Sequence, residues 1–69
     1  MSVYRVTEVI GTSTESWAEA ARNAVETAGQ TVRDLRIAEA TRFDVTIQDG
    51  KVAEYRVRLD ISFKYEQGD

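Results

Sequence analysis

The strictest pattern in the chain is an alternation of apolar and polar residues over residues 53–66. Every second residue in this segment is apolar, and the set is Ala53, Tyr55, Val57, Leu59, Ile61, Phe63 and Tyr65. Because successive side chains of a strand point to opposite faces of the sheet, this period of two predicts one long strand with an apolar and a charged face. Twelve to fourteen residues in this conformation extend roughly 40–45 Å.

Two other segments have strand character, and a helix is expected between them. Residues 3–10 are rich in β-branched and aromatic side chains and predict a strand that ends at Gly11. Residues 36–47 predict a second long strand. A stripe of apolar residues at helical spacing predicts a helix that ends near Gly29, and it consists of Trp17, Ala20, Ala21, Ala24, Val25 and Ala28. The run Thr12-Ser13-Thr14-Glu15 has the pattern of a capping box at the start of this helix.

The Asp49-Gly50 dipeptide predicts a hairpin between the two long strands. A three-residue loop over residues 49–51 pairs Ile47 with Ala53, Phe43 with Val57 and Asp44 with Arg56. This register keeps apolar residues together on one face, so we expect it. The resulting order is β-α-β-β in a single α+β domain over residues 1–69, and the place of the first strand in the sheet is left open.

Length and composition favour self-association. A 69-residue domain is marginal by itself unless disulfides, a metal or oligomerisation supports it. Cysteine and histidine are absent, so disulfides and the commonest metal ligands are excluded. A helix of about 17 residues is roughly 25 Å long and cannot cover the apolar face of the hairpin. Either the strands bend to wrap the helix more tightly, or the hairpin packs against other copies of the chain, and we expect the second arrangement.

The charge and the N-terminus limit the partners that we expect. The net charge of −3 argues against nucleic acid, which is bound through basic surfaces. No apolar run approaches the ~20 residues of a membrane span. The N-terminal segment lacks the apolar region of a signal peptide, so we expect a cytoplasmic protein. The charged face of the last strand is either solvated or forms a wall of a closed particle.

Short segments spread along the whole chain follow one another in a characteristic order. They are Tyr4-Arg5-Val6, Ile10-Gly11-Thr12-Ser13, an alanine-rich helix, Thr31-Val32-Arg33, Asp49-Gly50-Lys51-Val52, Glu54-Tyr55-Arg56-Val57 and Phe63. On these segments the chain resembles the dodecin family. The resemblance implies a helix across a three-stranded antiparallel sheet and a hollow homododecamer that stores or buffers ligands. Family members often bind flavins (FMN or riboflavin) in pairs between subunits, and some bind coenzyme A.

The flavin site that the resemblance implies falls on Ile37, Asp44 and Arg56, and this chain departs from the family pattern at all three. Flavin-binding members carry a stacking tryptophan at Ile37 and a hydrogen-bonding glutamine at Arg56. At Asp44 bacterial members often have an arginine that holds the flavin phosphate, which an aspartate would repel. An isoleucine covers a ring without the extra stacking energy, on the order of 1 kcal/mol. The three differences argue against flavin.

The start Met1-Ser2-Val3-Tyr4 and the early helical Trp17 are similar to a dodecin branch that lacks the stacking tryptophan and includes a calcium dodecin. This similarity implies calcium, which takes six to eight oxygen ligands. The candidate ligands, brought together by symmetry, are Glu39, Asp44 and Asp60, with Glu54 and Glu66 as further carboxylates. Each of these carboxylates has an ion pair or plain solvation as its alternative. Trp17 itself is expected to anchor the core or an interface.

Glu39 has the parity of Ile37 and Phe43, so we expect it on the apolar face. A carboxylate there needs a partner, for which Arg33, Arg36 or an ion from a neighbouring subunit is available.

Three functional hypotheses follow. The first is a small-ligand binding and storage shell, with flavin as the family default. The second is an ion-binding or purely structural shell without flavin. The third is an enzyme, which the absence of histidine, cysteine and a nucleophile constellation disfavours.

Overall fold

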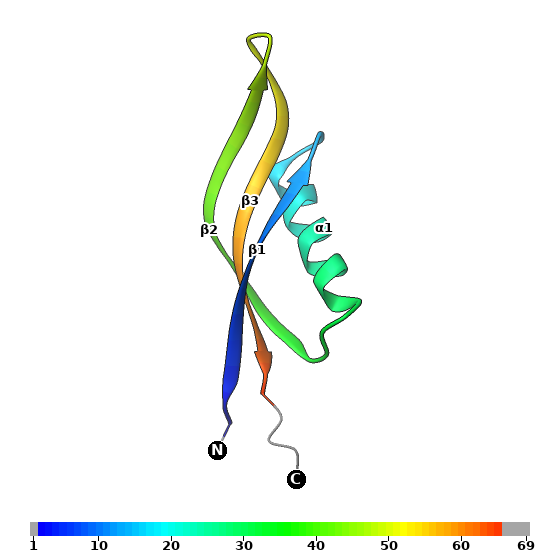
Figure 1. Ribbon diagram of the computed structural model, residues 1–69, viewed down its shortest axis with the longest axis vertical. Coiled ribbons are helices and arrows are strands. Elements are labelled where there is room, and N and C mark those ends of the chain that lie inside the picture. The colour runs from blue at the N-terminus through cyan, green and yellow to red at the C-terminus, as the bar shows by residue number, and fades with distance from the viewer. Residues whose placement is uncertain (1, 66–69) are drawn as a thin grey trace.

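The structure, a computed structural model, describes residues 2–65. It contains β1 (Tyr4–Ser13), α1 (Trp17–Gly29), β2 (Leu35–Gln48) and β3 (Lys51–Lys64). The strands form one antiparallel sheet in the order β1-β3-β2 (Figure 1). The expected β-α-β-β order and three-stranded sheet are confirmed, and β1 lies beside β3. Among residues 2–65, no helix has the length and apolar character needed to cross a membrane.

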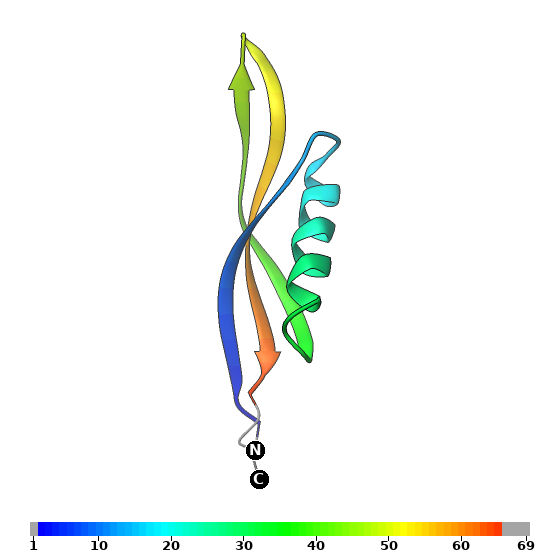
Figure 2. The same ribbon diagram turned by 45° about the vertical axis from the view of Figure 1, so that its right-hand side comes forward.

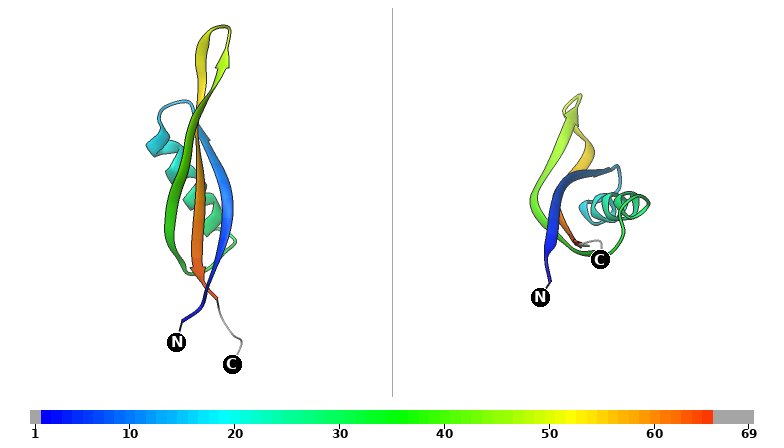
Figure 3. Two further views of the ribbon diagram at one scale, coloured as in Figure 1. Left: turned by 90° about the vertical axis from the view of Figure 1, so that its left-hand side faces the viewer. Right: turned by 60° about the horizontal axis from the view of Figure 1, so that its bottom comes forward.

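The hairpin of β2 and β3 extends beyond the helix. The molecule measures 54 × 20 × 14 Å, and the hairpin tip projects past the end of α1 (Figure 2). α1 lies on one face of the curved sheet (Figure 3). Ala20 of the helix packs there against Val57, Leu59 and Ile61, and these four residues form the buried core of the described chain. Full burial of a leucine or isoleucine side chain stabilises the fold by about 1.5–3 kcal/mol.

The helix begins later than the sequence pattern indicates. β1 continues to Ser13, and the helix is capped by Ser16, whose hydroxyl accepts a hydrogen bond from the backbone N–H of Glu19 at 3.0 Å. The expected capping box over Thr12–Glu15 is therefore wrong. β1 does not end at Gly11 because the missing side chain there lets the helix backbone at Ala20 lie directly against the strand.

The hairpin loop is shorter than expected. Asp49 and Gly50 both have positive φ angles, 53° and 74°, which is the backbone of the two-residue turn that matches the twist of paired strands. Ile47 pairs with Val52, so the expected three-residue loop and the pairing of Ile47 with Ala53 are wrong. A bulge at Ala53 absorbs the difference, and the expected pairs of Phe43 with Val57 and of Asp44 with Arg56 are confirmed.

Two further bulges in β2 reverse the direction of its side chains. The register shifts between Leu35 and Ile37 and between Ala40 and Arg42. Each extra residue moves the following side chains to the other face of the sheet. Glu39 therefore pairs with Asp60 on the face away from α1, and the expectation that Glu39 lies on the apolar face is wrong.

Candidate functional site

The described candidate residues all lie on the face of the sheet that α1 does not cover, called here the open face. Glu66 lies outside the described residues. The open face is defined on β3 by Arg56, Arg58, Asp60 and Ser62, which alternate with Val57, Leu59 and Ile61, the residues buried against the helix. Residues paired across strands share a face, so each of these four residues is the centre of a row that runs from β1 to β2. The chemistry of the open face follows from the composition of these rows.

The row of Arg56 contains the strongest ion pair of the described chain. Arg56 donates from Nε to Oδ1 of Asp44 at 2.8 Å and from Nη2 to Oδ2 at 2.9 Å. This bidentate hydrogen bond lowers the pKa of the Asp44 carboxyl below its ordinary value and raises the pKa of the Arg56 guanidinium. The two charges offset each other, so Asp44 does not present an uncompensated negative charge, while the N–H groups of Arg56 outside the pair stay available to other acceptors.

An aromatic cluster supports the Asp44 backbone from the other side of the sheet. Trp17, at the start of α1, donates from Nε1 to the carbonyl oxygen of Asp44 at 3.0 Å. Its ring meets Tyr55 edge to face with a centroid distance of 5.1 Å, and Phe43 at 6.1 Å. Trp17 thus ties the helix to the base of the projecting hairpin. The sequence pattern predicted that Trp17 anchors the core or an interface. It did not predict the contact with Asp44, because the two residues are 27 positions apart in the chain.

Ile37 lies on the same face but not beside the ion pair. It is opposite Ser62 and its side chain is 68% exposed. Ser62 and Arg56 are separated by six residues of β3, which correspond to roughly 20 Å. Within one chain, Ile37 therefore cannot contact the same small ligand as Asp44 and Arg56. A pocket that uses all three positions requires more than one copy of the chain.

Of the three proposed metal ligands, Glu39 and Asp60 are neighbours, whereas Asp44 lies in the row of Arg56. Glu39 pairs with Asp60, and on the other side Asp60 pairs with Glu8 of β1, which the sequence reading did not single out. Glu8 lies 3.9 Å from the guanidinium of Arg58 in the next row. In residues 2–65, no group of three or more carboxylates is placed so as to hold a metal ion by itself. Because Asp44 is paired with Arg56, one copy of the chain does not provide a calcium site.

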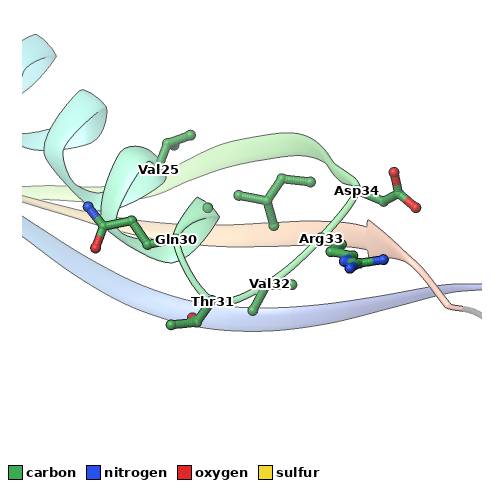
Figure 4. A pocket seen from close by; sticks show the side chains of 8 residues that line it. Val25, Gln30, Thr31, Val32, Arg33 and Asp34 are labelled. Carbon is green, nitrogen blue, oxygen red and sulfur yellow. The ribbon is translucent and has the colours of Figure 1, made fainter.

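The surface pockets described for the single chain do not provide a closed binding site. The largest one described, of about 600 Å³, lies over the loop between α1 and β2 and is lined by Val25 and residues 29–35. Figure 4 shows that the side chains of Gln30 and Asp34 point away from one another, at opposite ends of this loop. The polar groups do not converge on a common point, as they do in most ligand sites.

Comparisons with known proteins agree with this geometry. The family model described as Dodecin matches residues 3–66. The chain is 42% identical over 64 residues to the calcium dodecin of Mycobacterium tuberculosis, covering 93% of this chain and 90% of that relative. The structure of dodecin from Streptomyces coelicolor is similar with a TM-score of 0.93 and 45% identity, covering 97% and 96% of the two chains. The crystal structure of the calcium dodecin from M. tuberculosis, described as calcium chelating with a novel calcium-binding site, is similar with a TM-score of 0.83 and 40% identity, again covering 97% and 96%.

Proposed function

Because the chain belongs to the dodecin family, we propose that it assembles into a hollow shell of twelve copies that binds a small ligand between its subunits. The observation that carries the proposal is the amount of apolar surface that one chain leaves uncovered. The proposed activity is binding and storage, not catalysis. We also propose a cytoplasmic location, which fractionation of the producing cells tests.

The uncovered surface is large for a chain of this size. Ten large apolar side chains of the described residues are at least 40% exposed, namely Val3, Tyr4, Val6, Ile10, Trp17, Ile37, Phe43, Ile47, Val52 and Tyr65. Among residues 2–65 the buried core holds four residues. Exposure of ten large apolar side chains is a heavy load for a domain of this length, which is marginal without further burial. Association with other copies covers these side chains and supplies the missing stability.

The ligand that we propose to test first is a flavin held between copies, because it is the family default, although Ile37, Asp44 and Arg56 depart from the flavin-site pattern. Ile37 offers an exposed apolar surface for the ring, and the neutral Asp44–Arg56 pair does not repel a phosphate as a free aspartate would. Titration of the assembled protein with FMN, followed by flavin fluorescence, tests this assignment. Quenching that saturates supports flavin binding, whereas unchanged fluorescence at micromolar protein contradicts it.

The variant Ile37→Trp tests whether this position contacts the ring. Stacking adds about 1 kcal/mol, so the variant should bind FMN about fivefold more tightly than the wild type. Ile10→Trp is the matched control, because Ile10 lies on the same open face, two rows away along β1. Equal affinity of wild type and Ile37→Trp would remove Ile37 from the site.

A second candidate ligand is calcium, favoured by the acidic row of Glu8, Asp60 and Glu39. Since one chain does not complete a site, the remaining oxygens would come from another copy or from water. If calcium binds this row, it should raise the thermal midpoint of the particle, and Asp60→Asn should abolish that rise. Glu54→Gln is the control, a carboxylate on the same strand outside the row. Equal calcium responses of both variants would exclude the row.

A further inference from the structure

The outer edge of β1 carries free backbone hydrogen-bonding groups whose positions can be deduced. The N–H of Tyr65 donates to the carbonyl oxygen of Val3 at 2.8 Å, so the odd-numbered residues of β1 bond to β3. The even-numbered residues, from Tyr4 to Thr12, therefore direct their N–H and C=O groups away from the sheet. The carbonyl oxygen of Thr12 accepts a hydrogen bond from the Asn23 side chain at 3.2 Å, which agrees with this direction.

The two edges of the sheet differ in regularity. β1 pairs with β3 without a register shift over all ten residues, whereas β2 has two bulges, at Arg36 and Thr41. Bulges such as those on β2 are devices that block the pairing of an edge with another strand, whereas charged side chains occur on both edges, Arg5 and Glu8 on β1 and Arg36 and Arg42 on β2. β1 lacks bulges and proline, and its free segment ends at Thr12, where Asn23 occupies the acceptor. The edge available for pairing is thus residues 4–10.

We propose that β1 pairs edge to edge with β1 of a second copy, antiparallel about a two-fold axis, so that two sheets join into one of six strands. This inference rests on the assembly proposed above and specifies one of its contacts. An open groove of about 440 Å³ between the edge and α1, lined by Ile10, Thr12, Asn23 and Thr27 among others, leaves room for the end of the incoming strand.

The register follows from the free groups and the side chains. Only even-numbered residues have free groups, so hydrogen-bonded partners must both be even. An axis at Thr7 pairs Tyr4 with Ile10 and Val6 with Glu8, which uses every free group of residues 4–10 in about eight hydrogen bonds. This register also places the aromatic Tyr4 opposite the β-branched Ile10 and the two copies of Thr7 opposite each other, and both kinds of pair are favourable across strands. The two copies of Glu8 are not opposite each other.

Disulfide cross-linking tests this register, because the natural chain has no cysteine. The axis places the two Thr7 residues in a pair without hydrogen bonds, where Cα atoms lie about 4.5 Å apart, within disulfide range. Thr7→Cys should therefore form a covalent dimer on mild oxidation inside the intact particle. Arg5→Cys is the matched control on the same face of β1, since its two copies would be roughly 13 Å apart along the strands. Cross-linking of Arg5→Cys but not of Thr7→Cys would overturn the register.

Hydrogen exchange of the wild type separates this inference from the proposed function. In an assembled particle with paired edges, the amides of Val6, Glu8 and Ile10 should exchange at least about 100-fold more slowly than unprotected amides. An intact particle in which these amides exchange freely would overturn the edge pairing and leave the shell standing. A folded monomer would overturn both.

Discussion

The contact of Gly11 with the helix leads to a specific prediction for Gly11→Ala. A Cβ atom at this position would overlap the carbonyl oxygen of Ala20 and lie 2.8 Å from Cβ of Ala24. A carbon and a carbonyl oxygen need about 3.3 Å, so α1 would have to move away from β1 by roughly 1 Å. Backbone cannot yield as a side chain does, and a gap of that size forfeits a quarter to a half of the dispersion energy of the contacts it opens.

The expected change in the free energy of unfolding follows from two opposing effects, overpacking and the loss of backbone freedom in the unfolded chain. Overpacking of a core costs about 1–3 kcal/mol, and replacing glycine by alanine in a strand returns about 0.5–1 kcal/mol. Because the obstruction is backbone, we expect Gly11→Ala to lower the free energy of unfolding by about 2 kcal/mol. Urea unfolding followed by circular dichroism measures this, at one protein concentration for all variants, because association makes stability depend on concentration.

Gly29→Ala is the control for this prediction. The nearest atom to its new Cβ is Cδ1 of Leu35 at 3.7 Å, an ordinary contact, and Gly29 is helical. This variant should be more stable than the wild type by about 0.5–1 kcal/mol. A Gly11→Ala protein as stable as Gly29→Ala would refute the close packing of α1 on β1.

Three further predictions concern the hairpin and the core. Asp44→Asn should reduce the free energy of unfolding at neutral pH. The difference between variant and wild type should vanish as the pH falls below 3.8 and through the lowered pKa of Asp44, because protonation of Asp44 in the wild type breaks the pair with Arg56. Urea midpoints of both proteins, measured against pH, check this. Trp17→Phe should cost about 1 kcal/mol through the lost hydrogen bond to Asp44, and circular dichroism is the readout because the only tryptophan is removed. Leu59→Asp should prevent folding and assembly, since the side chain is 2% exposed, and a normal particle on size-exclusion chromatography would contradict its place in the core.

The fold could be predicted from periodicity where the strands are regular. The alternation along β3 identified the buried face with Val57, Leu59 and Ile61, and the helical stripe identified the face of α1 that covers them. The capping residue was missed, although Ser16 is followed three residues later by Glu19, because an equally good pattern begins at Thr12.

The candidate site could be predicted only in part, because bulges are not visible in the apolar pattern. The pairing of Asp44 with Arg56 followed from the register near the loop. The position of Glu39 did not, since the inserted residue at Thr41 exchanges the two faces for residues 37–40, up to the second bulge at Arg36. The acidic row with Glu8 also depends on the place of β1 in the sheet, which no local pattern determines.

Native mass spectrometry of the protein as purified tests the central claim most directly, because it counts the chains in the particle without any label. The account predicts a species of twelve chains, with flavin or calcium adducts appearing when those ligands are added. A stable, folded single chain at micromolar concentration would contradict it, because the exposed side chains of Phe43, Ile47 and Val52 would then face water without a partner.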